Sequence, residues 1–208
     1  MIQTIIFDYG GVITETKRSD CFSIWASDRY ALDINEVQRL FQGHHFDQYL
    51  RGKISRQQFF TKFQEIGIDA DIDCMSRQLV SCNAPVSRMR SLLVQLSLKY
   101  DLCLISDSTP ELTEDVRRKF QHIFRVSIFS DEHGFIKDDR TLYDIALTEI
   151  GTDPNKCLYI DDRKEKLEYP RSRGVHSIHF GNVELLRTEL VSSYGIDVGV
   201  SANAEYDN

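Results

Sequence analysis

The sequence predicts an α/β fold: a three-layer, Rossmann-like core with a parallel sheet between helices, and an additional α-helical cap. After residue 85, short apolar runs alternate with helical patterns, which is typical of parallel strands joined by helices. Residues 16–85 show helical patterns only and contain no strand-like run. The helical part therefore interrupts the α/β pattern directly after its first strand.

This pattern predicts three parts of the 208-residue chain. Residues 1–15 and 86–191 form the α/β core, and residues 16–85 form a helical cap over its active face. Residues 192–208 include Gly195 and Gly199 and have no periodic pattern, so we expect a weakly ordered tail.

The first strand, residues 4–7, is apolar and runs directly into Asp8. Gly10 and Gly11 follow, and glycines let a backbone turn sharply and approach a ligand closely. Open α/β sheets hold their ligands at the carboxyl ends of the strands. Asp8 is therefore the first candidate for a functional side chain.

The clearest helix of the cap follows Ser55, which can form a capping box with Gln58. Ile54 and Phe59 provide a hydrophobic staple, and Gly67 ends the helix. In the core, the predicted strands after the first are residues 102–106, 126–129, 157–160 and 175–180. Helices are expected between these strands. One begins at Thr109 and Pro110, and another ends at Gly151. Apolar stripes mark two of them, at Leu92, Leu93 and Leu96 and at Leu142, Ile145, Ala146 and Ile150.

Composition excludes several classes of function. The net charge of -7 offers no basic field for a nucleic-acid backbone, so we expect no nucleic-acid partner. No apolar run approaches the roughly 20 residues that span a bilayer, and the N-terminus lacks the basic start of a signal peptide, so we expect no membrane partner. The oligomeric state is left open by the sequence.

The five cysteines have an odd count and no CxxC spacing. Cys103 and Cys157 lie in apolar strand-like runs, which predicts small buried thiols and argues against a zinc site. This usage predicts a reducing, cytoplasmic environment.

Polar side chains stand at or just after the ends of four predicted strands. They are Asp8, Ser106, Lys137 and the pair Asp161 and Asp162. Each alone has an ordinary explanation as a helix cap or a solvated side chain. Because parallel strands end at one edge of a sheet, we expect the set to converge there. A nucleophilic carboxylate, a hydroxyl, a cation and further acids are the groups that phosphoryl transfer with Mg²⁺ requires.

These segments resemble the motifs of the haloacid dehalogenase-like superfamily, in particular its small phosphatase-like branch with a helical cap after the first strand. The similar segments are residues 7–12 (FDYGGV), 104–108 (LISDS), 134–137 (GFIK) with 142–147 (LYDIAL), and 160–163 (IDDR). In the cap, residues 51–55 (RGKIS) also resemble that branch. The resemblance covers nearly the whole chain up to about residue 180.

The resemblance implies a Mg²⁺-dependent phosphatase of small phosphorylated metabolites. It implies that Asp8 is the nucleophile that becomes an aspartyl-phosphate, and that Lys137 assists catalysis. Mg²⁺ would be held by Asp8, the backbone carbonyl of Gly10, and Asp162 with Asp161. The substrate phosphate would be bound by Ser106 and Lys137, with Asp107, Gly10 and Gly11 beside it.

Four positions depart from the family pattern. Gly10 stands where many members have an acid-base aspartate, whose assistance is worth roughly 10²–10⁴-fold in rate. Asp107 adds a negative charge beside the phosphate site, and Lys166 replaces a metal-supporting side chain. Pro170 predicts that the helix after residue 163 is short or kinked. These changes keep open a weakened relative that binds a ligand or protein, and carbon–halogen hydrolysis by Asp8 is a third, less favoured reading.

Several cap residues have both a functional and an ordinary explanation. His44 or His45 could replace the missing proton donor, although a polar connection between helices is favoured. Aromatic side chains could line a pocket but are more often core: Trp25, Phe41, Phe46 and Tyr49. The acids at 69, 71 and 73 lack the glycine and glutamate of a calcium loop and are expected to cap a helix. Arg163 could contact a carboxylate or substrate, or form a surface ion pair.

Overall fold

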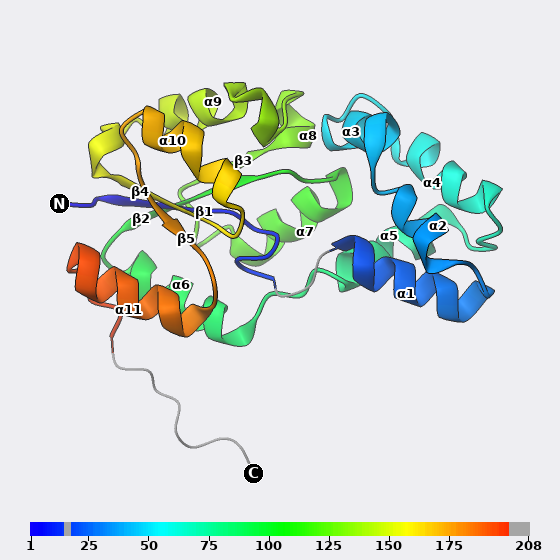
Figure 1. Cartoon of the computed structure of the whole chain (residues 1–208), viewed down its shortest axis with the longest axis horizontal. Coiled ribbons are helices and arrows are strands. Elements are labelled where there is room, and N and C mark those ends of the chain that lie inside the picture. The colour runs from blue at the N-terminus through cyan, green and yellow to red at the C-terminus, as the bar shows by residue number, and fades with distance from the viewer. Residues whose placement is uncertain (15–17, 200–208) are drawn as a thin grey trace, which may run out of the picture.

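The computed structural model describes residues 1–14 and 18–199, and it contains a five-stranded parallel sheet in the order β3-β2-β1-β4-β5 (Figure 1). The strands are β1 (Thr4–Phe7), β2 (Asp101–Ser106), β3 (Val126–Phe129), β4 (Cys157–Asp161) and β5 (His176–His179). All four strand pairs are parallel, as the alternating pattern predicted. The central strand, β1, runs from the N-terminus toward the helices drawn at the right of Figure 1.

Alternate residues of β1 pack into different layers, because side chains of a strand point to opposite faces. Ile5 and Phe7 join a core with α6 (Ser87–Ser97), α7 (Pro110–Phe120) and α11 (Val183–Tyr194). Ile6 joins a second core with α9 (Thr141–Ile150) and α10 (Glu168–Ser172). The short elements between them are α8 (Ser130–His133), η1 (Lys137–Asp139), η2 (Pro154–Lys156) and η3 (Lys164–Leu167). The result is the predicted three-layer core.

The helices of residues 18–81 form a separate cluster beyond the carboxyl ends of the strands, here called the helical unit (Figure 1). Its members are α1 (Arg18–Tyr30), α2 (Ile34–Arg39), α3 (Gly43–Leu50), α4 (Arg56–Glu65) and α5 (Ile72–Ser81). The predicted capping box of Ser55 and Gln58 starts α4, and Asp71 caps α5. The aromatic residues singled out in the sequence pack into the unit's own core, which confirms their ordinary explanation.

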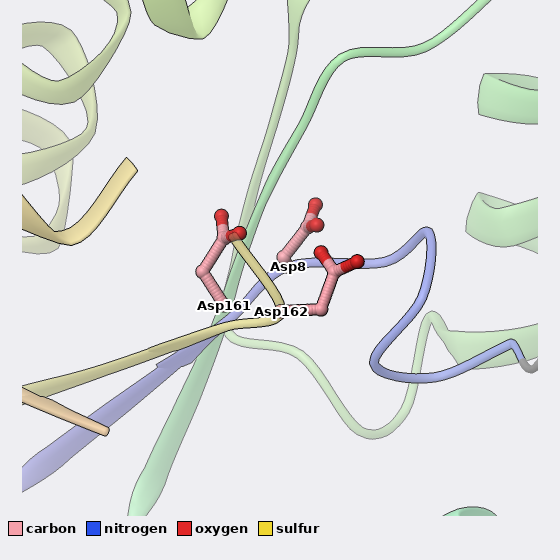
Figure 2. A group of neighbouring side chains, drawn as sticks. All are labelled: Asp8, Asp161 and Asp162. Atoms are coloured by element: carbon pink, nitrogen blue, oxygen red, sulfur yellow. The ribbon is translucent and has the colours of Figure 1, made fainter. Parts of the chain in front are cut away.

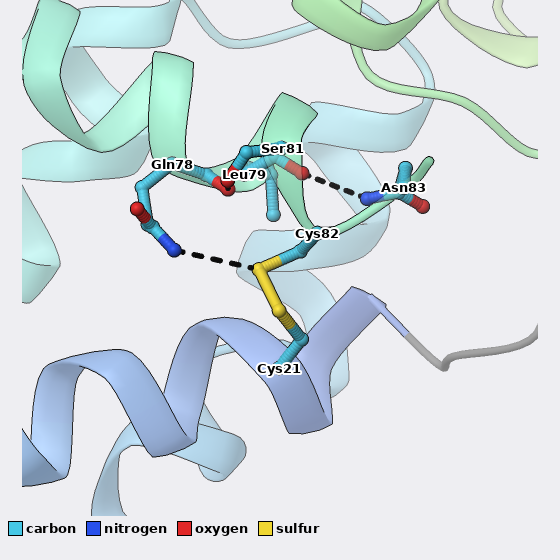
Figure 3. Close-up of a disulfide and its surroundings, with 6 residues drawn as sticks. All are labelled: Cys21, Gln78, Leu79, Ser81, Cys82 and Asn83. Carbon is cyan, nitrogen blue, oxygen red and sulfur yellow. Dashed lines mark hydrogen bonds between the residues drawn. A yellow bond between two sulfur atoms is a disulfide. The ribbon is translucent and has the colours of Figure 1, made fainter. Parts of the chain in front are cut away.

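The chain passes between the core and the helical unit at two adjacent points. Thr14 pairs with Pro85, and the amide of Val86 donates to the carbonyl of Ile13. Close to this crossing, a disulfide joins Cys21 of α1 to Cys82, the residue after α5 (Figure 3). Cys103 and Cys157 are buried thiols, as predicted, but the paired cysteines differ from the reduced state that cysteine usage had indicated.

The sequence-based prediction places the start of the weakly ordered tail too early in the chain. Helix α11 continues to Tyr194, and the side chains of Ile196 and Val198 are buried in the core, so the expectation of weak order is wrong for residues 192–199. The rest of the predicted tail, residues 200–208, lies outside the described residues. Pro170 falls in the first turn of the five-residue helix α10, which confirms the expected short helix. In the described part of the chain, every helix is too short or too polar to cross a membrane.

Candidate active site

Three carboxylates meet where β1 and β4 end. Asp8 follows β1, Asp161 ends β4, and Asp162 comes next; each offers an oxygen, and these oxygens lie within 4.8 Å of one another (Figure 2). The amide of Asp8 donates to the carbonyl of Ile160 at 2.9 Å, which holds the two strand ends together. The order of the sheet reverses between β1 and β4, and open α/β sheets bind ligands at such a reversal.

Lys137 joins this group from the segment that follows β3. Its Nζ lies 2.8 Å from Oδ1 of Asp8 and 2.9 Å from Oδ2 of Asp161. The side chain is almost completely enclosed, with 1% of its surface exposed. A buried cation is stable only when opposite charges surround it, and here two carboxylates do. The structure therefore brings Asp8, Lys137, Asp161 and Asp162 together, as expected for side chains at one sheet edge.

The two acids of the Asp161–Asp162 pair have different surroundings. Asp161 accepts from the hydroxyl of Tyr159 at 2.6 Å and from the amide of Arg163 at 2.9 Å, in addition to Lys137. Asp162 is only half-buried, yet its Oδ1 is buried and has no hydrogen-bond partner among the described residues. Asp162 therefore has an oxygen available for a cation, whereas Asp161 is committed to holding Lys137.

The turn after Asp8 fits closely against Asp162. Gly11 has a φ of +85°, and a Cβ atom built on it would lie 2.5 Å from Oδ2 of Asp162. Gly10 has open space around the position of a Cβ atom. A side chain would therefore fit at Gly10, whereas Gly11 permits both the backbone conformation and the close approach to Asp162.

Burial and the neighbouring charges push the pKa values of Asp8 and Asp161 apart. Burial raises the pKa of Asp8 to about 7; Lys137 opposes this shift, and Asp161 and Asp162 add to it. Asp161 is also disfavoured by burial, but Lys137 and the Tyr159 hydroxyl outweigh it and lower its pKa. Burial and the neighbouring Asp161 raise the pKa of Asp162. Burial works against the charge of Lys137, but the surrounding acids, led by Asp8, outweigh it and raise its pKa. The site thus holds one firmly ionised acid and another that exchanges a proton near neutrality.

Ser106 and Asp107 line the adjacent strand end. Ser106 is buried at the end of β2. Asp107 accepts from the backbone amide of Lys137 at 2.8 Å and lies 3.7 Å from the guanidinium of Arg163. These partners balance the extra negative charge that the sequence had placed beside the phosphate site.

Two other side chains singled out in the sequence lie in ordinary surroundings. The ammonium of Lys166 is buried and bound by the carboxylate of Asp138. The ring of His45 stacks on Phe59 within the helical unit, with 6.0 Å between the centroids. His45 lies in helix α3 rather than in a connection between helices, and its buried Nε2 has no hydrogen-bond partner among the described residues, so its role as proton donor stays a prediction.

Sequence reasoning missed Tyr159 and Ser130. Tyr159 stands two residues before Asp161 in β4, so strand periodicity places both on one face, and this signal was available. Ser130 begins α8 and accepts the amide of Ser108 at 2.9 Å, which joins the segments after β2 and β3. Only the three-dimensional structure reveals that second contact.

Comparison with known proteins identifies related folds and sequences. A family model described as haloacid dehalogenase-like hydrolase matches residues 2–168. The sesquiterpene phosphatase astK of Aspergillus oryzae is 23% identical over 179 residues, which cover 84% of this chain and 87% of that protein.

Solved structures show the same fold at low sequence identity. The HAD family enzyme bt-2542 from Bacteroides thetaiotaomicron, in complex with magnesium and inorganic phosphate, matches with a TM-score of 0.76 and 18% identity over 89% of this chain and 99% of that one. A predicted HAD-like family hydrolase from Porphyromonas gingivalis has a TM-score of 0.76 and 20% identity, over 92% and 98%. L-2-haloacid dehalogenase from Xanthobacter autotrophicus has a TM-score of 0.63 and 15% identity, over 92% and 83%.

Proposed function

The chain belongs to the haloacid dehalogenase-like hydrolase family, and we propose that it is a Mg²⁺-dependent phosphatase of small phosphorylated molecules. The observation that carries this proposal is the position of Lys137, bound between Asp8 and Asp161, while Oδ1 of Asp162 has no partner in the described part of the chain. A buried cation suits a dianionic phosphate, and a carboxylate oxygen free of hydrogen bonds to the described residues, beside a second acid, suits a divalent cation. One similar protein is named as a sesquiterpene phosphatase, and a structure of another was solved in complex with magnesium and inorganic phosphate. Both support the proposal of a Mg²⁺-dependent phosphatase.

The residues fit Mg²⁺, which prefers oxygen ligands. Asp8, Asp162 and the backbone carbonyl of Gly10 would hold the ion, with Asp161 holding Lys137 rather than the metal. When bound, Mg²⁺ offsets the charge of the phosphoryl oxygens and of the attacking carboxylate.

Asp8 would act as the nucleophile. A carboxylate oxygen of Asp8 attacks phosphorus, the bond from phosphorus to the substrate oxygen breaks, and the alcohol leaves after taking a proton from solvent. Water then attacks the aspartyl-phosphate, releasing inorganic phosphate and restoring the carboxylate. Lys137 and the hydroxyl of Ser106 would bind the phosphoryl oxygens during both steps.

The helical unit would act as a cap over this site. It stands beyond the carboxyl ends of the strands, where Asp8 lies, and the chain passes between it and the core at two adjacent points (Figure 1). In that position it would exclude water and select the organic part of the substrate.

Asp8→Asn is expected to lose all Mg²⁺-dependent phosphate release, because an amide is a poor nucleophile and a weaker ligand. Asp162→Asn should lower both Mg²⁺ affinity and turnover, by about tenfold or more. Asp161→Asn, the matched control, should keep most of the Mg²⁺ affinity but lower turnover, since Asp161 binds Lys137.

Phosphate release from a panel of phosphate esters, with Mg²⁺ titrated by calorimetry, measures both properties. Activity retained by Asp8→Asn would contradict the assignment of Asp8 as the nucleophile. Halide release that persists in a chelator would support dehalogenation instead.

A further inference from the structure

One turn of the helical unit contacts the segment that carries Lys137. Arg51, at the end of α3, pairs through both terminal nitrogens with the carboxylate of Asp139; Nη2 lies 3.1 Å from Oδ1, and Nη1 bonds Oδ2. The Arg51 side chain is 14% exposed and that of Asp139 is 28% exposed. A two-point arginine–carboxylate pair fixes direction as well as distance, especially when water has limited access.

Asp139 has a second partner within its own segment. Its Oδ2 accepts the backbone amide of Ile136 at 2.9 Å, so the same oxygen serves Arg51 and the residue before Lys137. The amide of Lys137 in turn donates to Asp107 at 2.8 Å. A continuous set of bonds thus joins the helical unit to the backbone of Lys137.

The residue after Arg51 leaves no space between the two parts. Gly52 has a φ of +63°, and a Cβ atom built on it would overlap the backbone carbonyl of Asp131 in α8. The turn therefore rests directly on the core backbone, and this contact holds Arg51 at the distance where it reaches Asp139.

We propose that Arg51 is a positioning residue for Lys137: through Asp139 it couples the seating of the helical unit to the placement of the catalytic ammonium. This inference rests on the proposed function for its effect on turnover, but the coupling itself is a property of the fold. When the unit lifts from the core, Asp139 loses Arg51, and the segment of residues 136–139 keeps only its contacts with the core, including the bond from the Lys137 amide to Asp107. Lys137 is then held most precisely when the unit is seated over the site.

Arg51 offers a matched control because it has two acidic partners. Asp47, four residues earlier in α3, lies 3.1 Å from Nε of Arg51 and belongs to the helical unit, whereas Asp139 belongs to the core. Asp47→Asn removes charge beside Arg51 without touching the contact between the parts. Asp139→Asn weakens that contact while its amide oxygen can still accept the amide of Ile136.

The test compares Arg51→Gln, Asp139→Asn, the double variant and Asp47→Asn. We expect kcat for phosphate release from a simple aryl phosphate to fall about 10–100-fold in both single variants, with KM changed less than about threefold, because Lys137 acts mainly on the transition state. The double variant should be no worse than either single variant, since both break one interaction. Asp47→Asn should stay within about twofold of the original protein.

Hydrogen exchange of residues 134–140 provides a readout that needs no activity. Protection should fall in Arg51→Gln, Asp139→Asn and Gly52→Ala, and persist in Asp47→Asn. Mg²⁺ affinity, set by Asp8 and Asp162, should be unchanged in Arg51→Gln.

Two results would overturn the inference: protection in Arg51→Gln equal to that in Asp47→Asn, or single effects that add in the double variant. If the original protein releases no phosphate from any ester, the proposed function fails, and the exchange data still decide the coupling.

Discussion

Two acids that share one lysine partner differ in their other surroundings and in their pKa values. Lys137 contacts both Asp8 and Asp161, and each of these acids also accepts a backbone amide, from Tyr9 and Arg163 respectively; among the described residues only Asp161 also accepts a tyrosine hydroxyl. Asp161 is therefore held ionised, while burial keeps the pKa of Asp8 near 7. Such separated pKa values are common where one acid must react and another must orient.

The raised pKa of Asp8 predicts pH-dependent metal binding. In the proposed function Mg²⁺ would bind the ionised carboxylate, so below about pH 7 it would have to displace a proton, and its affinity should fall by about tenfold per pH unit. Above about pH 7 the affinity should be nearly constant. Calorimetric titrations in two buffers of different ionisation enthalpy measure both the affinity and the protons released.

The same shift affects the stability of the metal-free protein. Because the folded state holds the Asp8 proton more tightly than the unfolded chain does, this group's contribution is fully present below the ordinary pKa of 3.8 and is lost as pH rises through about 7. Asp8→Asn should remove this dependence. For metal binding, an affinity for Mg²⁺ that does not change between about pH 5.5 and 8.5 would contradict the predicted dependence on the Asp8 proton.

At the level of residues, the sequence predicts side chains that follow strands better than side chains that support them. Asp8, Ser106 and Asp161 each stand at a strand end, so their convergence follows from parallel topology alone. The partners of Asp107 and Lys166 could not be predicted, because Arg163 and Asp138 reach them from segments without regular periodicity. A charge that looks unfavourable in the sequence can be balanced by a partner that only the fold supplies.

At the level of elements, the turn after β1 determines how Asp8 faces Asp162. Gly11 has a positive φ, which favours glycine, and Asp162 leaves no space for a side chain there. Gly10 does not have a positive φ, and the space around its Cβ position is open. The sequence indicated a glycine turn but could not distinguish the two positions, because that difference depends on Asp162 from the far half of the chain.

This difference predicts unequal effects of two alanine substitutions. Gly11→Ala should cost about 1–3 kcal/mol from the backbone conformation alone, and should lower Mg²⁺ affinity by displacing Asp162. Gly10→Ala should bind Mg²⁺ nearly as well as the original protein. Thermal unfolding and metal titration of both variants make the comparison. Equal losses in the two variants would show that the approach to Asp162 is unimportant.

Elements with strong periodic signals were predicted well, and those without them were not. The strand at residues 126–129 and the capping box of α4 agree with the sequence in detail. The end of the chain was misjudged because Ile196 and Val198 follow Gly195 without a repeating pattern, yet they pack against the sheet layer. Burial of such residues depends on the cavity that other elements leave.

For the whole molecule, the main feature is that it consists of two bodies with separate apolar cores. The helical unit packs around its own aromatic cluster, and the α/β core packs on both faces of the sheet. The disulfide between Cys21 and Cys82 joins the first and last helices of the helical unit, next to the crossing that connects the unit to the core (Figure 3). Its placement secures the ends of the unit rather than the sheet.

We therefore expect Cys82→Ser to destabilise mainly the helical unit. The bond closes a segment with a sequence separation of 61 residues, and the chain-entropy estimate for such a loop is about 4 kcal/mol, within a usual range of about 2–4. Hydrogen exchange should increase in residues 18–81 more than in the strands, and the melting temperature should fall by several degrees. Cys74→Ser, which alters an unpaired cysteine of α5, should leave both properties nearly unchanged. Protein purified without reductant and then unfolded in denaturant should titrate as three free thiols, and five would show that the bond does not form.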